Sequence, residues 1–329
     1  MIIVTGGAGF IGSAVVWGLN TRGRRDILIV DRLAARGQSE KWKNLVDLRY
    51  HDFIPADRFP EELARGKWKS ARIEACIHMG ACSSTTETNA DYLMQNNYAY
   101  TRALAEYCVR HNIRFIYASS AATYGNGEQG WGDDDAATER LRPLNIYGYS
   151  KHAFDLSALR QGWDKRMVGL KFFNVFGPNE YHKGEMRSVV HKAYQALLAG
   201  QEFRLFRSHR PDIADGEQKR DFLWVKDAVK VILFFLENKN LCGIYNVGSG
   251  KASGFNDLLR AVMRAMNISG GIQYADMPPD LRERYQYFTE ADITKLRRAG
   301  YAEPFTPLDE AIREYILEYL SKYPWLCPR

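Results

Sequence analysis

The feature that most constrains the fold is a glycine-rich turn near the start of the chain, TGGAGFIGS (5–13). It follows a short apolar stretch (2–6) and precedes a helical pattern (10–23) that stops at a glycine. Glycines at this spacing permit a tight turn and a close approach of the backbone to a phosphate, and the helix N-terminus offers free N–H groups. The segment therefore predicts a pyrophosphate site on a strand–turn–helix unit. The glycines at this spacing are Gly6, Gly9 and Gly12.

Strand and helix patterns alternate along the first half of the chain. Strand patterns lie at 2–6, 27–31, 74–81, 114–120 and 167–175, and weaker signals lie near 45–52. Helix patterns lie at 10–23, 91–112, 147–163 and near 186–199. A strand followed by a helix is expected at 219–238, and a last short strand at 243–250. This alternation predicts an α/β fold with a Rossmann-type, doubly wound parallel sheet.

The alternation loosens after Asn174, where loops with Pro and Gly surround the remaining patterns. We therefore expect a dinucleotide-binding domain made of residues 1–172 plus 224–248. The remaining residues, 173–223 plus 249–329, are expected to form a smaller mixed α/β lobe that binds the substrate.

Composition excludes several classes of protein. The 329 residues are 46% hydrophobic and 26% charged, as in soluble globular proteins. No apolar run approaches the roughly 20 residues that span a bilayer, and no signal peptide is expected before the first strand. The net charge of +6 is scattered, which favours an anionic small ligand over nucleic acid. The five cysteines show no metal-like spacing, so neither a disulfide framework nor a metal site is expected. A chain of this kind is expected in the reducing cytoplasm.

An acidic residue at the end of the second strand pattern indicates the type of dinucleotide. Asp31 lies about twenty residues beyond the glycine turn, where a carboxylate accepts hydrogen bonds from the adenosine ribose of NAD. Arg32 and Lys41 follow, and a cation beside the ribose can hold a 2′-phosphate. NADP is favoured and NAD stays open, since both cations can also be plain surface residues.

The segment YGYSK places Tyr147 and Lys151 four residues apart, on one face of a predicted helix. A free tyrosine has a pKa of about 10 and is a poor base at neutral pH. We expect the lysine and an oxidised nicotinamide ring to stabilise the phenolate and lower the Tyr147 pKa. The preceding strand ends in ASSAATYG, from which Ser120 can hydrogen-bond the same substrate oxygen. The pattern predicts proton removal from a hydroxyl during hydride transfer.

In order along the chain, TGGAGFIG, SSAATYG, YGYSK, NVFGP and RDFLWVKD resemble the extended short-chain dehydrogenase/reductase family of nucleotide-sugar epimerases and dehydratases. The resemblance covers the whole chain. Dehydratases of this family carry an Asp–Glu pair after the threonine that matches Thr123. Here Tyr124 and Gly125 follow Thr123, so elimination chemistry is not expected.

Within that family, five further segments resemble the branch that epimerises ADP-heptose. They are GACSSTTE (80–87), NNY (96–98), HKGEM (182–186), KRDF (219–222) and RYQYFTEADI (284–293). The resemblance implies conversion of ADP-D-glycero-β-D-manno-heptose to the L-glycero epimer at C6″, on the route to the lipopolysaccharide inner core. It also implies a tightly bound NADP and a homo-oligomer.

The resemblance further implies two bases, because hydride must return to the opposite face of an oxidised carbon. The bases matching the family are Tyr147 and Lys183. A buried lysine can have a lowered pKa and act as a base or an acid. Alternatively, Lys183 could pair with a substrate phosphate or with Glu180.

Other roles are implied by the same matched segments. Cofactor contacts would come from Phe10, Ile11, Met79, Gly80, Ala81, Ser83, Asn96, Tyr147, Lys151, Val175 and Lys183. Substrate contacts would come from Ser83, Asn174, Glu185, Lys192, Phe206, Arg220 and Tyr285. The chain departs from the family pattern at Ser13, Met79, Glu185 and Lys192, and in a longer loop at 207–218.

Two alternatives to this activity remain. Another nucleotide-sugar epimerase, such as a 4-epimerase, would share every general motif and invert a ring carbon. A non-catalytic dinucleotide-binding protein is disfavoured, because such proteins often lose the tyrosine or the lysine, whereas Tyr147, Lys151 and Ser120 are all present.

Overall fold

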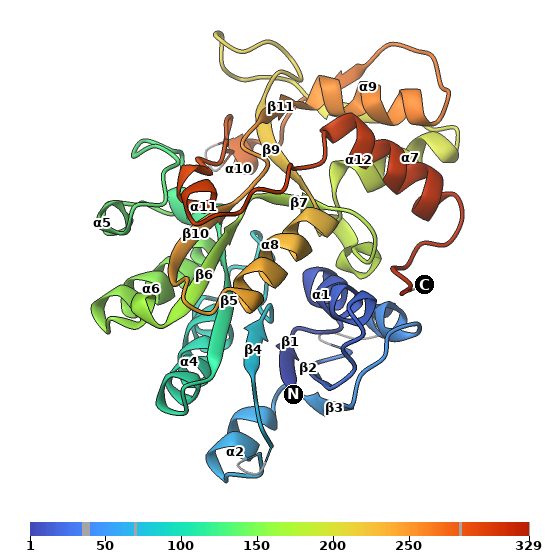
Figure 1. Cartoon of the computed structure of the whole chain (residues 1–329). Helices are drawn as coiled ribbons and strands as arrows, with labels where there is room; N and C mark the ends of the chain where they lie inside the picture. The colour runs from blue at the N-terminus through green and yellow to red at the C-terminus, as the bar shows by residue number, and fades with distance from the viewer. Residues whose placement is uncertain (35–39, 69–70, 283–284, 329) are drawn as a thin grey trace.

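The computed structural model describes residues 1–34, 40–68, 71–282 and 285–328. The described chain forms a larger lobe around a parallel sheet and a smaller lobe at its carboxyl edge (Figure 1). Residue 284, the first of the segment RYQYFTEADI, lies outside the described part. Within that part, no helix has both the length and the apolar character needed to cross a membrane.

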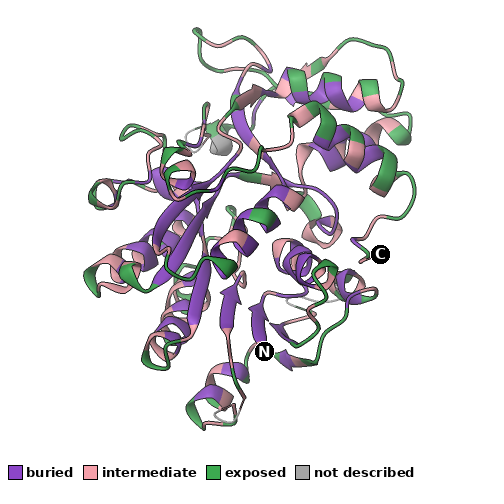
Figure 2. Ribbon diagram, in the orientation of Figure 1, coloured by how far each residue is buried: buried purple, intermediate pink, exposed green. Residues whose placement is uncertain are grey.

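Seven parallel strands form the larger sheet, in the order β10-β6-β5-β4-β1-β2-β3. Their bounds are β1 Ile2–Thr5, β2 Ile27–Asp31, β3 Asp52–Pro55, β4 Ala75–His78, β5 Arg114–Ser120, β6 Met167–Phe172 and β10 Gly243–Val247. The central strands are buried along their whole length (Figure 2), which explains their continuous apolar sequences. The Rossmann-type, doubly wound sheet predicted from the sequence is confirmed.

Helices cover both faces of this sheet (Figure 1). On one face lie α1 (Phe10–Thr21) and α8 (Val225–Glu237), whose apolar side chains join one core cluster with Ile2, Val4 and Ile77. On the other face lie α2 (Phe59–Ala64), α4 (Tyr100–Arg110) and α6 (Ile146–Arg160), packed on a second cluster. The two cores fix the sheet between helix layers, so its carboxyl edge is the side left for a ligand.

The smaller lobe contains two small sheets and three packed helices. The sheets are β11-β9-β7, from Ala252–Gly254, Lys219–Trp224 and Asn174–Phe176, and β12-β8, from Gln273–Ala275 and Arg204–Phe206. The helices are α7 Val189–Leu198, α9 Phe255–Ala265 and α12 Leu308–Glu314, which share one core cluster. The remaining short helices are α3 Ala90–Leu93, α5 Asp135–Thr138, α10 Pro279–Arg282 and α11 Thr294–Arg298.

The expected strand at 167–175 is in fact two strands that belong to different sheets. β6 ends at Phe172 in the larger sheet, and β7 begins at Asn174 and pairs with β9 in the smaller lobe. The chain returns when β9 ends at Trp224 and α8 packs beside α1. On these grounds we propose the two-domain division expected from the sequence.

Two other elements differ from expectation. The weak region at 45–52 leads into β3, a short and mostly exposed edge strand whose pattern carries little apolar signal. The helix expected at 91–112 consists of α3, a π-helical turn at Met94–Ala99 and α4. Such turns insert a residue into a helix and are frequent beside functional sites, and Asn96 within this one lines the cleft described next.

Candidate active site

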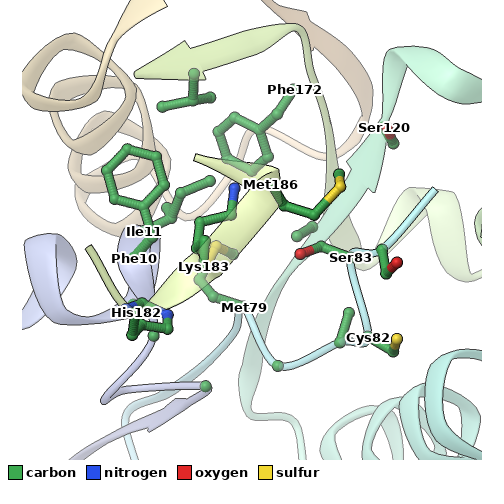
Figure 3. Close-up of a pocket in the computed structure, with 18 of the residues that line it drawn as sticks. Phe10, Ile11, Met79, Cys82, Ser83, Ser120, Phe172, His182, Lys183 and Met186 are labelled. Carbon is green, nitrogen blue, oxygen red and sulfur yellow. The ribbon is translucent and has the colours of Figure 1, made fainter. Parts of the chain in front are cut away.

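A cleft of about 1080 Å³ lies along the carboxyl ends of the central strands and extends under the smaller lobe (Figure 3). The sheet order reverses between β1 and β4, which is where open α/β sheets bind ligands. The volume is at the upper end of small-molecule sites and can hold more than one ligand group. The predicted residues that line it are Gly6, Gly9, Phe10, Ile11, Gly12, Asp31, Arg32, Lys41, Met79, Gly80, Ala81, Ser83, Asn96, Ser120, Tyr147, Lys151, Asn174, Val175 and Lys183.

The glycine turn has room for backbone and none for side chains. A β-carbon on Gly12 would lie 2.0 Å from the carbonyl oxygen of Gly6. Gly6 has φ +66°, and a β-carbon there would lie 2.6 Å from the backbone nitrogen of Gly80. The N-cap of α1 is Gly9, which supplies no side chain to cap the first N–H groups. The bare helix terminus facing the cleft therefore fits a dinucleotide pyrophosphate.

Asp31 ends β2 at the rim of the same cleft and is fully engaged. Its carboxylate accepts hydrogen bonds from the N–H groups of Ala8 (2.8 Å) and Arg32 (2.7 Å). It also forms an ion pair with Lys41, whose Nζ lies 2.5 Å from Oδ1. The Arg32 guanidinium pairs with Asp57. Lys41 neutralises the Asp31 carboxylate, so this carboxylate repels a phosphate near the ribose less than a free aspartate would.

Tyr147 and Lys151 project from the first turns of α6 into the cleft. Lys151 Nζ donates to the carbonyl oxygen of Ala118 (2.8 Å), and burial lowers its pKa to about 8 against the charges of Asp155 and Cys82. Burial raises the pKa of Tyr147, and a hydrogen bond from Ser120 acts in the opposite direction. In the chain alone, desolvation of the phenolate outweighs its protein neighbours, and the expected lowering, which includes a positive nicotinamide ring, stays a prediction.

A buried ion pair beneath these residues was not predicted. Lys171 Nζ on β6 lies 2.7 Å from Asp155 Oδ2 on α6, and both side chains are inaccessible to solvent. The same carboxylate accepts hydrogen bonds from Ser119 (2.7 Å) and Tyr117 (2.9 Å), which come from β5. These bonds fix α6 to the strand that carries Ser120. The one available sequence signal was a lysine inside the apolar stretch MVGLKFF.

Lys183 enters the cleft from the loop between β7 and α7, where Figure 3 shows it beside Phe10 with its nitrogen directed into the pocket. Nζ lies 5.3 Å from the centre of the Phe10 ring, and it forms no ion pair with any described residue. Burial lowers the pKa of Lys183, and the Glu180 carboxylate opposes this. The alternative of an ion pair with Glu180 is therefore wrong, since that carboxylate bonds Ser188 instead.

Three predicted substrate residues lie together outside the cleft lining, in the smaller lobe. The Arg220 guanidinium lies 5.0 Å from the Tyr285 ring centre and 5.9 Å from that of Phe255, which lines the cleft. The rings of Phe206 and Tyr285 meet edge to face at 6.4 Å. The cluster therefore packs behind Phe255, at the part of the cleft wall that the smaller lobe supplies.

Glu185 and Lys192 differ from the rest of the predicted set. They form an ion pair of 3.2 Å in which the glutamate side chain is 93% exposed, and neither residue lines the cleft. His182, the first residue of the segment HKGEM, also lines the cleft, although no role was predicted for it. Burial and the charges of Lys41 and Lys183 lower the pKa of His182 to about 4.

A glycine turn at a sheet switch point, joined in one cleft to a Tyr–Lys pair and a serine, defines a class: enzymes that use a nicotinamide dinucleotide to oxidise a hydroxyl. Comparison with known sequences agrees. Residues 2–248 match the NAD dependent epimerase/dehydratase family, and the chain belongs to this family.

Individual members of the family differ in how similar they are to this chain. The chain is 54% identical over 325 residues, 98% of each chain, to the ADP-L-glycero-D-manno-heptose-6-epimerase of Nitratidesulfovibrio vulgaris (strain DP4). Among solved structures it resembles that of the Helicobacter pylori ADP-L-glycero-D-manno-heptose-6-epimerase, with 26% identity, TM-score 0.80 and 96% and 95% of the two chains covered. It also resembles a UDP-N-acetylglucosamine 4-epimerase from Methanobrevibacter ruminantium M1, with 25% identity, TM-score 0.81 and 98% coverage of both.

Proposed function

We propose that the chain converts ADP-D-glycero-β-D-manno-heptose to ADP-L-glycero-β-D-manno-heptose by inverting C6″. The observation that carries this proposal is the presence of two proton-accepting side chains, Tyr147 and Lys183, in one cleft with the glycine turn. The 54% identical relative over nearly the whole chain supports the choice of ADP-heptose.

When bound, the dinucleotide supplies reversible acceptance of hydride from C6″. The residues that would hold it are those of the glycine turn, Asp31 and Lys151. Ser120 hydrogen-bonds the C6″ oxygen, and Tyr147 removes its proton as the carbon becomes a carbonyl. Since burial raises the pKa of Tyr147 in the chain alone, the phenolate depends on a positive charge near the ring and on Lys151.

The second base follows from geometry at the inverted carbon. After oxidation, the C6″ carbonyl must turn its other face to the same hydride, which moves its oxygen away from Tyr147. A proton donor is then required at a second position, and Lys183 enters the cleft from the loop after β7. Burial lowers the pKa of Lys183, which makes its ammonium a better proton donor than that of an exposed lysine.

The nucleotide end of the substrate is assigned to the smaller lobe. Arg220 carries a buried guanidinium with no carboxylate partner among the described residues, and a diphosphate would supply one. Phe206 and Tyr285 offer aromatic surface for adenine. Asn174 and Val175 line the cleft on β7, which pairs with β9, the strand that carries Arg220.

We further propose that the resident cofactor is NADP. A free Asp31 carboxylate would repel a 2′-phosphate. In this structure Lys41 pairs with the Asp31 carboxylate, and the backbone N–H of Arg32 donates to it. The measurement is release of the bound dinucleotide by denaturation, followed by mass spectrometry; NAD alone would contradict this assignment.

The proposal also includes a cytoplasmic location, where NADP and the nucleotide sugar are both available. It further includes assembly into a homo-oligomer. All five cysteines are free in the structure, as a reducing compartment requires. Light scattering of the purified protein tests the oligomer, and a monomer at working concentration would contradict it.

The test of the reaction is proton NMR of the purified protein with ADP-D-glycero-β-D-manno-heptose and no added cofactor. We expect the C6″ epimer to form. An unchanged spectrum, even after NADP is added, would contradict the proposal. Epimerisation of a UDP-hexose at C4 would then favour the second candidate, a 4-epimerase. The similarity to the Methanobrevibacter structure is the observation that supports this candidate.

A further inference from the structure

The four residues that precede Lys183 are each anchored by a side chain to a different part of the molecule. Glu180 accepts hydrogen bonds from Ser188 and from the Tyr315 hydroxyl (3.0 Å), and the Tyr181 hydroxyl donates to the Pro324 carbonyl oxygen (2.5 Å). Those two anchors belong to the smaller lobe and the C-terminal segment. The anchors of Asn179 and His182 lead instead to the glycine turn.

Asn179 connects the loop to α1. Its side chain is fully buried, its φ is +76°, and its Nδ2 donates to Ser13 Oγ at 2.9 Å. Ser13 follows the last glycine of the turn and is itself inaccessible to solvent. The Asn179 Oδ1 accepts the N–H of Leu326 at 3.0 Å, which satisfies the other end of the amide.

Asn44 makes the second connection. Its Nδ2 lies 3.0 Å from the Ala8 carbonyl oxygen inside the glycine turn, 3.1 Å from the Asn179 carbonyl oxygen and 3.2 Å from His182 Nδ1. The two N–H bonds of this amide are therefore shared among three acceptors, which lie in the turn and at both ends of the tetrapeptide before Lys183. Since the pKa of His182 is lowered to about 4, its ring is neutral and accepts this bond at neutral pH.

Lys183 has no comparable anchor of its own. Its ammonium contacts the Phe10 ring and forms no ion pair with a described residue, while burial disfavours its charge. Desolvation and side-chain entropy both favour rotation of such a lysine into water. Its place in the cleft therefore depends on the backbone that carries it.

We propose that Asn44 and Asn179 are positioning residues that hold the Lys183 loop against the cofactor-binding turn and so keep the second base in the cleft. This inference rests on the proposed function, because it assigns Lys183 a role there. It explains why the loop is bonded to the turn itself: the distance between second base and cofactor is then fixed by hydrogen bonds rather than by lobe closure.

The experiment follows Lys183 directly. Protein with its dinucleotide bound and with lysine labelled by carbon-13 at Cε is titrated by NMR, and Lys183→Met assigns the signal. The variants are Asn44→Leu, which keeps volume, and Asn179→Gly, which tolerates the positive φ. Ser13→Ala is a milder third variant that removes one bond. Asn246→Leu, also buried and hydrogen-bonded but on β10, is the matched control.

We expect the Lys183 titration midpoint to rise by about one pH unit in the Asn44 and Asn179 variants, as the ammonium gains water. Their kcat should fall roughly 10- to 100-fold with KM within about twofold. Asn246→Leu should lower thermal stability and leave the midpoint unchanged.

A wild-type midpoint in Asn44→Leu, Asn179→Gly and Ser13→Ala would overturn the inference and leave a merely structural role. The titration needs no substrate. A wild-type protein that leaves ADP-heptose unchanged would therefore contradict the proposed function separately, without affecting the result for Lys183.

Discussion

Three lysines in and beneath the cleft have different surroundings, and those surroundings separate their roles. Lys171 has a buried carboxylate partner, Lys151 has a carbonyl oxygen, and Lys183 has an aromatic ring. Burial lowers the pKa of Lys151 and of Lys183, neither of which forms an ion pair with a described carboxylate. The pairing pattern thus distinguishes a structural lysine from the two that face the reacting groups.

Lys151 makes stability depend on pH. Its pKa is about 8 in the folded chain and 10.5 in the unfolded chain, so the unfolded state binds more protons between these values. The free energy of unfolding therefore rises with pH across this window, by about 3 kcal/mol for this group. Urea denaturation of the dinucleotide-free protein at pH 7 and 9.5 should show the rise, and Lys151→Met should lack it. An equal rise in both proteins would contradict this assignment.

The two-base proposal predicts opposite defects for two single variants. Lys183→Met should slow cofactor reduction by one C6″ epimer, and Tyr147→Phe by the other, each roughly 100-fold or more. The nicotinamide absorbance after rapid mixing with each epimer measures both half-reactions. The double variant should retain the dinucleotide and lose turnover. Turnover by the double variant, or equal slowing with both epimers, would contradict the proposal.

Local patterns indicated the residues of the site whose chemistry depends on near neighbours. Tyr147 and Lys151 lie on one helix, and the three glycines lie in one turn, so spacing alone brought them together. Asn44 and Asn179 are 135 residues apart and meet only through the tertiary fold, which no spacing reveals. The burial that raises the Tyr147 pKa in the chain alone likewise depends on the tertiary fold.

At the scale of elements, the glycine turn has no room for a β-carbon at Gly6 or Gly12. Gly12→Ala would place a methyl group 2.0 Å from a backbone oxygen, so either the turn or the start of α1 must shift. We expect loss of bound dinucleotide, measured by absorbance of the purified protein. Gly271→Ala, where no atom lies within 4 Å, is the control and should bind normally. Normal binding by Gly12→Ala would contradict the assigned role of the turn.

The strands show what the sequence could predict at this scale. β1, β2, β4 and β5 are buried on both faces, and their apolar runs gave their positions within one to three residues. β3 is an exposed edge strand and was missed. The boundary between β6 and β7 was missed because one continuous apolar stretch serves two sheets.

For the whole molecule, two ion pairs close within the larger lobe, whereas the smaller lobe holds a buried arginine without a carboxylate partner among the described residues. The buried Lys171–Asp155 pair and the Asp31–Lys41 pair each close within the larger lobe. Arg220 in the smaller lobe is 6% exposed, stacks on Tyr285 and donates only to the Lys219 carbonyl oxygen among the described residues. A charge buried in this way is a cost to the fold that a diphosphate between the lobes would offset.

Arg220→Met tests this division between stability and binding. Stacking contributes about 1 kcal/mol, whereas burying an unpaired cation costs several kcal/mol, so the variant should be more stable by roughly 1–4 kcal/mol without substrate. Loss of a charge-assisted contact should raise KM for the nucleotide sugar roughly 10- to 100-fold, with the dinucleotide still bound. Thermal denaturation and initial rates measure the two effects. A variant with unchanged KM, or one destabilised without substrate, would show that Arg220 supports the lobe rather than the ligand.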